Sequence, residues 1–413
     1  MLEFLESFDF LSPSQYGFRK QLSTASAMFD FVHFIQSALD KSQFCSALFI
    51  DLTKAFDSVN HKILISLLNK ARVEGAALNW FVSYLSDRRQ RVKCNNVLSD
   101  EIKVEYGVPQ GSVLGPILFL VVINSLGFLK TTGKLFMFAD DLALLYSDVN
   151  IAGLEERIRL GSVAIFDHLK NLRLTPNVSK TKYMLFSKGS QNLPDLSLFF
   201  GDQFLSRVYS FKFLGIYLTS DLSWDMHIQT LVSKLKPVIV VLSRLKNTLP
   251  RSHLKKMYYS LIHSRMSYLA FIWGRTPYNT LRPLILLQNW AMRALFGFGV
   301  YHPVKDMYVS TGILPLTYYI SFSSLLFFYK IVNGLLFIRT SLSLVNQVTN
   351  YSIRSGSNIL PQLFSTKYGL TSVYYKSISE FNSLPIIIRL INSYQSFKNS
   401  VFEHVQRSLN SVR

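Results

Sequence analysis

The sequence predicts an α+β fold in which helices cover one side of an antiparallel sheet. Three observations lead to this class: a buried strand over 46–52, a tight hairpin over 135–146, and helical periodicity between and after them. With 413 residues, 49% of them hydrophobic and 17% charged, the chain can bury sizeable cores. We expect two to four domain-sized units.

The predicted elements follow one another without repeats. In the first half they are a helix over 21–42 behind a Ser23-Thr24 cap, the strand 46–52, helices over 59–70 and 75–86, a turn-rich loop at 106–112, a helix over 113–128, the hairpin, a helix over 153–172 and a strand at 183–186. Beyond Trp224 the pattern is mostly helical, with helices over 228–245, 252–272 and 281–296.

The predicted hairpin carries Asp140 and Asp141 at its tip. Two adjacent carboxylates between apolar strands repel each other and are poorly hydrated, so a cation would stabilise them. A solvated Asp-Asp turn is the alternative. A third acid, Asp51, ends the strand 46–52, and three carboxylates on adjoining strands could bind two Mg²⁺ ions. The sequence has no clustered Cys and His, which argues against zinc.

The charge of the chain is unevenly distributed. Residues 1–224 hold 23 Lys and Arg against 21 Asp and Glu, whereas residues 225–413 hold 21 against 4. Such a basic C-terminal half suggests a polyanionic partner, either nucleic acid or an anionic membrane.

The membrane alternative depends on Met307–Tyr329, which has no charged residue and is long enough to span a bilayer. Gly312, Pro315 and many hydroxyl side chains interrupt it, so we expect a buried helix or pair of helices and no membrane partner. Two cysteines are too few for a disulfide framework, and the N-terminus has no signal-peptide pattern. These features indicate an intracellular protein, nuclear or cytoplasmic.

Several motifs together resemble those of reverse transcriptases. Residues 49–57 (Phe-Ile-Asp-Leu-Thr-Lys-Ala-Phe-Asp) resemble motif A, 107–116 (Gly-Val-Pro-Gln-Gly-Ser-Val-Leu-Gly-Pro) motif B, and 138–141 (Phe-Ala-Asp-Asp) motif C. Further matches in the family's order are 15–20, 84–92, 177–181 and 213–215. The chain is most similar to the jockey-like branch of non-LTR retrotransposons over about residues 13–300.

The resemblance implies a right-hand polymerase with a ferredoxin-like palm. It places partial fingers at 1–45, the palm at 46–215 with a finger insertion at about 70–105, a thumb at 216–300 and a basic, mostly helical region at 301–413. The reverse transcriptase domain as a whole would cover about 1–220. The implied activity is RNA-directed DNA synthesis: extension of a DNA primer on an RNA template with deoxynucleoside triphosphates and two Mg²⁺, or Mn²⁺, ions.

The resemblance also implies residue roles. Asp51, Asp140 and Asp141 would be the metal-binding catalytic acids, and Lys180 would protonate the leaving pyrophosphate, although a solvated lysine is the alternative. Substrate binding would involve Phe56 as a steric gate against ribonucleotides, Gln110, Gly111 and Arg19; Phe56 could instead be an ordinary core residue, and the Gln110 loop a structural start of a helix. The primer grip would be Phe213, Leu214 and Gly215, and the arginines 88, 89 and 91 could contact template phosphates.

One departure from the family pattern qualifies these expectations. An Arg-Pro-Ile-Ser-like segment normally precedes the Gln-x-Gly-Phe-Arg block, and here the block begins at Gln15, so we expect an N-terminally truncated reading frame with endonuclease function supplied elsewhere. The alternative function is a nucleic-acid-binding protein that keeps the polymerase fold without polymerising; an unstable relic of an element is a third possibility.

Overall fold

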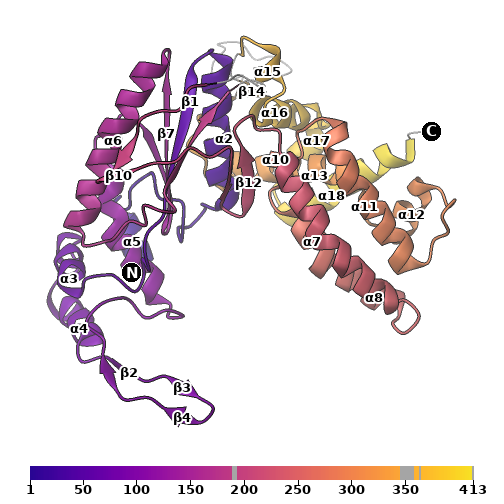
Figure 1. Ribbon diagram of the computed structural model, residues 1–413. Coiled ribbons are helices and arrows are strands. Elements are labelled where there is room, and N and C mark those ends of the chain that lie inside the picture. Colours follow the sequence, from indigo (N-terminus) through magenta and orange to yellow (C-terminus); the bar gives the residue numbers. More distant parts are fainter. Residues whose placement is uncertain (188–192, 345–357, 362–363, 412–413) are drawn as a thin grey trace. The chain divides into compact units, whose positions relative to one another are not determined.

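The computed structural model describes residues 1–187, 193–344, 358–361 and 364–411. The chain forms two compact units (Figure 1). The first comprises Met1–Ala27 and Ser42–Tyr209, and the second comprises Met28–Lys41 and Ser210–Arg413.

The first unit is built on an antiparallel sheet with the strand order β6-β7-β1-β8. Its strands are β1 (Phe44–Ile50), β6 (Lys134–Phe138), β7 (Asp141–Asp148) and β8 (Lys182–Phe186). The register pairs Ile50 of β1 with Leu142 of β7, and Phe138 of β6 with Asp141 of β7. The observed sheet and the helices packed on it confirm the α+β prediction.

Helices α3 (His61–Lys70), α5 (Leu114–Ile123) and α6 (Ile151–Asn171) share a hydrophobic core with one face of this sheet. The carboxamide oxygens of Asn60 and Asn150 cap α3 and α6 by accepting from Ile63 N and Gly153 N. Helix α5 is apolar on all sides, and residues 118–123 are accordingly all buried. The loop that precedes it is bonded to the segment after β1, through Gly107 N to Val59 O and Val108 N to Phe56 O.

The first unit also contains smaller elements. They are α1 (Leu2–Ser7), α4 (Gly75–Leu85), β2 (Arg89–Gln90), β3 (Lys93–Cys94), β4 (Val97–Leu98), β5 (Ile102–Lys103), a 3₁₀ helix (Asn124–Phe128), β9 (Phe199–Phe200) and β10 (Gln203–Phe204). Strands β2 to β5 form a thin arm that extends away from α4 (Figure 1). Residues 89–103 of this arm are exposed, so it contributes nothing to the core.

The second unit consists mostly of helices. Its elements are α2 (Thr24–Asp40), β11 (Ser210–Phe213), β12 (Ile216–Thr219), α7 (Asp225–Arg244), α8 (Arg251–Met257), a π-helix (Tyr258–His263), α9 (Ser264–Ser267), α10 (Ala270–Trp273), α11 (Tyr278–Phe296), α12 (Val304–Thr311), α13 (Leu316–Val332), β13 (Ser343–Leu344), β14 (Ile359–Leu360), α15 (Lys367–Leu370), α16 (Val373–Ser383), α17 (Ile386–Arg389) and α18 (Tyr394–Ser411).

Two buried aspartates on α2 anchor loops that lie some 300 residues later in the sequence. The Asp30 carboxylate accepts hydrogen bonds from the backbone N–H groups of Arg339 and Thr340, at 2.7 and 2.9 Å. The Asp40 carboxylate accepts from those of residues 365 and 366, at 2.8 and 3.0 Å. These bonds satisfy charges whose burial would otherwise be costly.

The apolar segment 307–329 forms a pair of helices, α12 and α13, which confirms the second of the two expected forms. Gly312 ends α12 with φ +63°, and Pro315 caps α13, so the two helices bend by 46°. Among the described residues no single helix has both the length and the apolar character to cross a membrane, and this bent pair meets that test only when its helices are taken together.

The boundary between the units falls after Tyr209, close to the predicted end of the palm, and residues 28–41 join the second unit. The division of these units into fingers, palm and thumb stays a prediction.

The pKa values of two histidines in the second unit, the buried His227 and the partly buried His263, predict how stability depends on acid. Burial, reinforced for His227 by the charge of Lys234, lowers the pKa of His227 to about 4, and burial lowers that of His263 to about 4. Each imidazole is therefore neutral in the folded chain and gains a proton on unfolding below its ordinary pKa of 6.5. The stability that this supplies is present above pH 6.5 and is lost as the pH falls toward 4.

Replacing His263 by Phe should therefore flatten the pH dependence of unfolding. We expect the decrease in the free energy of unfolding between pH 7 and pH 5 to shrink by about 2 kcal/mol relative to the wild type. Urea unfolding at the two pH values measures it, and the exposed His253→Phe is the matched control. An unchanged pH dependence in His263→Phe would contradict the prediction.

Candidate active site

Three carboxylates come together at one end of the sheet in the first unit. Asp51 directly follows β1, Asp140 lies in the turn between β6 and β7, and Asp141 begins β7. The two strands are antiparallel and Ile50 pairs with Leu142, so Asp51, which follows Ile50, comes opposite Asp141, which precedes Leu142. The sheet register thus joins residues that are 90 positions apart in the sequence.

These carboxylates influence one another electrostatically. Burial, together with the negative charges of Asp140 and Asp51, raises the pKa of Asp141 from its ordinary 3.8 to about 6. Asp140 and Asp141 keep contact with solvent, and Asp51 is half-buried. The repulsion that raises this pKa is the interaction that a bound cation would relieve.

A loop that precedes β8 adds one positive charge to this end of the sheet. Its backbone is fixed to Asp51, whose carbonyl accepts from Asn177 N at 2.8 Å and whose N–H donates to the Thr181 hydroxyl at 3.4 Å. The Lys180 ammonium consequently lies 3.7 Å from an Asp51 carboxylate oxygen. The structure therefore brings the predicted lysine to the predicted acids, while its role in catalysis stays a prediction.

The donor set suits a hard divalent cation, because carboxylate oxygens are the ligands that Mg²⁺ prefers. Within the described residues, no three His, Cys, Asp or Glu side chains are already grouped as metal ligands are. The three aspartates lie at the same end of the sheet, but their carboxylates would have to move closer together to hold an ion. Their mutual repulsion and oxygen chemistry fit such an ion.

The loop before α5 is tied to the segment that follows Asp51. Val108 N donates to Phe56 O at 2.9 Å, and the Gln110 carboxamide donates to the Asp57 carboxylate at 2.8 Å. Gly107 has φ +86°, and a Cβ there would lie 2.8 Å from Asp57 O, so this position requires glycine. Gln110 and Gly111 remain exposed, as a contact with a nucleotide would require.

Phe56 occupies a position that fits both expectations for it. Its ring stacks on Phe119 of α5 with centroids 4.5 Å apart, and it packs against the core of the first unit. It is nevertheless only half-buried. The structure therefore holds the ring firmly and leaves one part accessible, while the gating role stays a prediction.

The predicted nucleotide contact of Arg19 meets competition within the chain. Its guanidinium pairs with Glu6 at 3.3 Å and donates to the carbonyls of Leu11 and Ser12 at 3.3 and 2.9 Å. These bonds fix the N-terminal segment. A nucleotide contact by Arg19 would have to compete with them.

The predicted primer grip forms the turn of the β11–β12 hairpin in the second unit. Leu214 and Gly215 have φ values of +44° and +85°, as a two-residue hairpin of this hand requires. The Leu214 carbonyl accepts a hydrogen bond from the Tyr268 hydroxyl at 2.9 Å, and Phe213 packs on Phe31 of α2, with ring centroids 5.1 Å apart. The turn is therefore well anchored.

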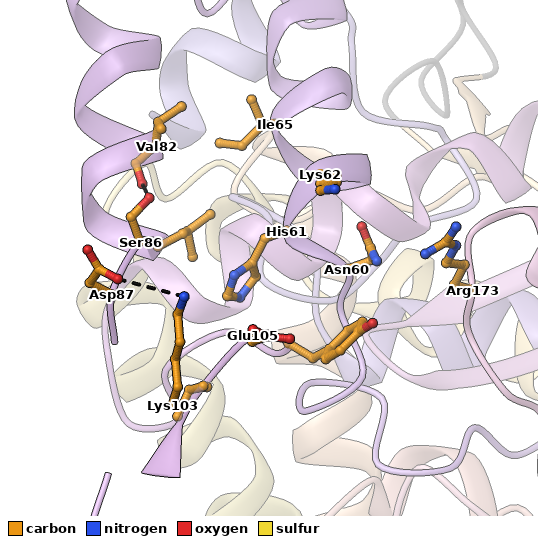
Figure 2. Close-up of a pocket in the computed structure, with 13 residues that line it drawn as sticks. Asn60, His61, Lys62, Ile65, Val82, Ser86, Asp87, Lys103, Glu105 and Arg173 are labelled. Carbon is orange, nitrogen blue, oxygen red and sulfur yellow. Dashed lines mark hydrogen bonds and ion pairs between the residues drawn. The ribbon is translucent and has the colours of Figure 1, made fainter. Parts of the chain in front are cut away.

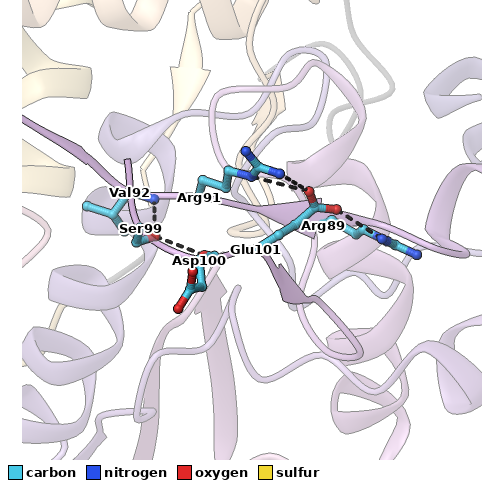
Figure 3. Close-up of polar contacts among 6 residues, drawn as sticks. All are labelled: Arg89, Arg91, Val92, Ser99, Asp100 and Glu101. Carbon is cyan, nitrogen blue, oxygen red and sulfur yellow. Dashed lines mark hydrogen bonds and ion pairs between the residues drawn. The ribbon is translucent and has the colours of Figure 1, made fainter. Parts of the chain in front are cut away.

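The arginines of the arm are partly neutralised within the arm itself. Figure 3 shows Arg89 and Arg91 both reaching the Glu101 carboxylate, at 3.2 and 2.6 Å. All three side chains are exposed or half-exposed, so these ion pairs are weak. A template phosphate would have to displace Glu101 to contact these arginines, and that competition weakens the predicted contact.

A hollow of about 810 Å³ lies between α3, the end of α4 and the base of the arm (Figure 2). Its wall combines the cations Lys62, Lys103 and Arg173 with the acids Asp87 and Glu105. It contains none of the three aspartates.

Two residues to which the sequence motifs assigned no individual role, His61 and Gln15, contribute to the geometry of the site. The His61 ring hydrogen-bonds the carbonyl of Gly107 at 2.7 Å, and the Gln15 carboxamide reaches the turn that carries Asp140. Gln15 belongs to a motif noted in the sequence, but only the fold reveals its contact. No sequence signal indicated His61.

The geometry agrees with comparisons to known proteins. Residues 1–218 match the family model described as reverse transcriptase (RNA-dependent DNA polymerase). The chain is 30% identical over 300 residues to the probable RNA-directed DNA polymerase from transposon BS of Drosophila melanogaster, covering 69% of this chain and 32% of the relative. It is 25% identical over 305 residues to the RNA-directed DNA polymerase from mobile element jockey of Drosophila funebris, covering 71% and 33%. The chain thus spans about a third of the length of these relatives.

Solved structures of telomerase are also similar to the chain. Apo telomerase from Candida tropicalis is 13% identical with a TM-score of 0.40, covering 77% of this chain and 54% of that one. Telomerase from Candida albicans, solved with a fragment of telomeric RNA, is 14% identical with a TM-score of 0.40, covering 78% and 55%.

The sequence match extends over more than half of the chain, and the relatives named above are polymerases of non-LTR retrotransposons, as the motifs predicted. The predicted right-hand polymerase fold agrees with that family. The chain belongs to the reverse transcriptase family of RNA-dependent DNA polymerases.

Proposed function

We propose that the chain is an RNA-directed DNA polymerase that extends a DNA primer on an RNA template. The observation that carries this proposal is that Asp51, Asp140 and Asp141 lie at the same end of the sheet. The Gln110 loop is bonded to Asp57, in the segment that follows Asp51. Family membership supplies the reaction class. The basic segment 225–413 supports binding of a nucleic-acid backbone.

Asp51, Asp140 and Asp141 are the residues that would hold two Mg²⁺ ions. When bound, such ions activate the primer 3′-hydroxyl and neutralise charge on the triphosphate. Mn²⁺ prefers the same oxygen ligands.

The chain's own residues would then position the nucleotide and manage a proton. Gln110 and Gly111 present an exposed loop to the incoming nucleotide, and the ring of Phe56, fixed on Phe119, excludes a ribose 2′-hydroxyl by contact. Lys180, held beside Asp51, can donate a proton to the leaving pyrophosphate. These residues select a deoxynucleotide and complete its transfer.

Replacing Asp140 by Asn should abolish primer extension. The substitution keeps the shape of the side chain and removes a charged metal ligand, so we expect product formation with Mg²⁺ and deoxynucleotides to fall more than about 100-fold. Extension of a labelled DNA primer on an RNA template measures it. Asp167→Asn on α6, at another exposed aspartate, is the matched control. Equal product from wild type and Asp140→Asn would contradict the proposal.

Replacing Lys180 by Ala should slow the chemical step. Loss of a general acid costs about 100-fold or more in kcat, with little change in the KM for template and primer. Single-turnover extension separates these effects. Lys182→Ala is the matched control. Lys182 lies two residues after Lys180, and its ammonium donates to the Ser206 hydroxyl instead of approaching Asp51. A loss confined to KM would indicate a binding role for Lys180 instead.

A further inference from the structure

The segment Phe10–Arg19, here called the strap, runs along the outer edge of β6. Tyr16 N donates to Met137 O at 2.8 Å, and Met137 N donates to Ser14 O at 2.9 Å, which makes the strap a short parallel neighbour of β6. Strand β6 ends at the turn that carries Asp140. The strap therefore reaches the catalytic turn from the side opposite β7.

The Gln15 side chain connects the strap to this turn. It is only 1% exposed, and its carboxamide oxygen accepts from the backbone N–H groups of Ala139 at 3.2 Å and of Gly17 at 2.8 Å. Its amide nitrogen has no hydrogen-bond partner among the described residues. The hydrogen bonds of this side chain are thus made to the turn and to the strap beside it.

Ala139 is a residue whose conformation needs such support. It has φ +57°, a left-handed conformation that is unfavourable for a side chain with a Cβ, and it immediately precedes Asp140. A relaxation of this residue would rotate the following backbone and redirect both carboxylates. The bond from Ala139 N to Gln15 opposes that relaxation.

Gly17 allows the close approach between strap and turn. A Cβ at this position would lie 2.7 Å from Ala139 N and 3.2 Å from the carbonyl carbon of Phe138. Any larger residue would push the turn away from the strap. The positions of Gln15 and Gly17 therefore serve the same contact.

The other end of the strap is fixed independently. The buried Asn124 side chain accepts from Ser12 N at 2.7 Å and donates to Phe10 O at 2.6 Å. Arg19 adds bonds to the carbonyls of Leu11 and Ser12. Because the strap is held at several points, it can act as a rigid support for the turn.

We propose that Gln15 is a positioning residue of the polymerase site: by holding Ala139 N, it keeps Asp140 and Asp141 in the orientation that binds divalent cations. This inference rests on the proposed function, in which these aspartates hold the metal. Residues that orient metal ligands without touching the metal commonly affect its affinity by about 10- to 100-fold.

Direct metal binding tests the inference without relying on activity. Binding of Mn²⁺ to the full chain, followed by the electron paramagnetic resonance signal of the free ion, should be at least about tenfold weaker in Gln15→Met, which keeps the size of the side chain and removes its acceptor. Gly17→Ala, which displaces the turn through its new Cβ, should show the same loss. In both variants, primer extension should recover at high Mg²⁺ concentration. Because Mg²⁺ binding also stabilises the folded chain, far-UV circular dichroism at the assay temperature should show each variant folded both with and without Mg²⁺, which separates weaker metal binding from loss of stability.

Ser14→Ala is the matched control, because it leaves the strap's backbone bonds to Met137 and the Gln15 contact intact. Asp140→Asn sets the background of binding outside the site. Folded Gln15→Met with wild-type Mn²⁺ affinity would overturn the positioning role, and Gly17→Ala decides the matter in the same way if Gln15→Met does not fold. Wild-type binding no tighter than that of Asp140→Asn would overturn the proposed metal site, and the positioning role with it.

Discussion

The pairing of β1 with β7 places the carboxylates of Asp51 and Asp141 at the end of a hydrophobic sheet, and the segments around them hold the backbone at this end in place. Burial and repulsion raise the pKa of Asp141 to about 6, so the charged form of this end of the sheet is costly in the isolated chain. The hydrophobic core behind the strands supplies the free energy that tolerates this cost. An arrangement that is unfavourable without a cation is favourable for binding one.

The segments around this end of the sheet fix backbone and leave the acidic side chains accessible. The loop that carries Lys180 bonds the backbone of Asp51, the Gln110 loop bonds the segment after Asp51, and the strap bonds the turn before Asp140. The strap is also bonded to Asn124, and the Gln110 loop to Val59 and His61. A site of this kind orients its ligands through the main chain, which is the usual basis of preorganised charge stabilisation.

Much of the fold and of the candidate site could be predicted from the sequence, for identifiable physical reasons. The strand before Asp51, the hairpin at Asp140–Asp141 and helix α6 have strong periodicity in their apolar residues. The acids were recognisable because adjacent carboxylates between apolar strands repel each other and are poorly hydrated, which indicates a bound cation. Contacts that depend on tertiary approach could not be predicted. The bond from Gln15 to Ala139 crosses 124 residues, and the ion pairs of Glu101 with the arm arginines depend on a register that the sequence does not specify. Helix α2 likewise joins the second unit through Asp30 and Asp40, whose partners lie beyond residue 338.

The central claim is that the three aspartates form a cation site, and thermal unfolding of the metal-free chain during titration with Mg²⁺ tests it most directly. Mass action predicts that Mg²⁺ at 100 times its dissociation constant stabilises the wild type by about 2.7 kcal/mol. In Asp141→Asn, the metal-free protein should melt at a higher temperature than the metal-free wild type because a repelling charge is gone, and most of the Mg²⁺-dependent increase should disappear. An equal increase in both proteins, or none in the wild type, would contradict the account.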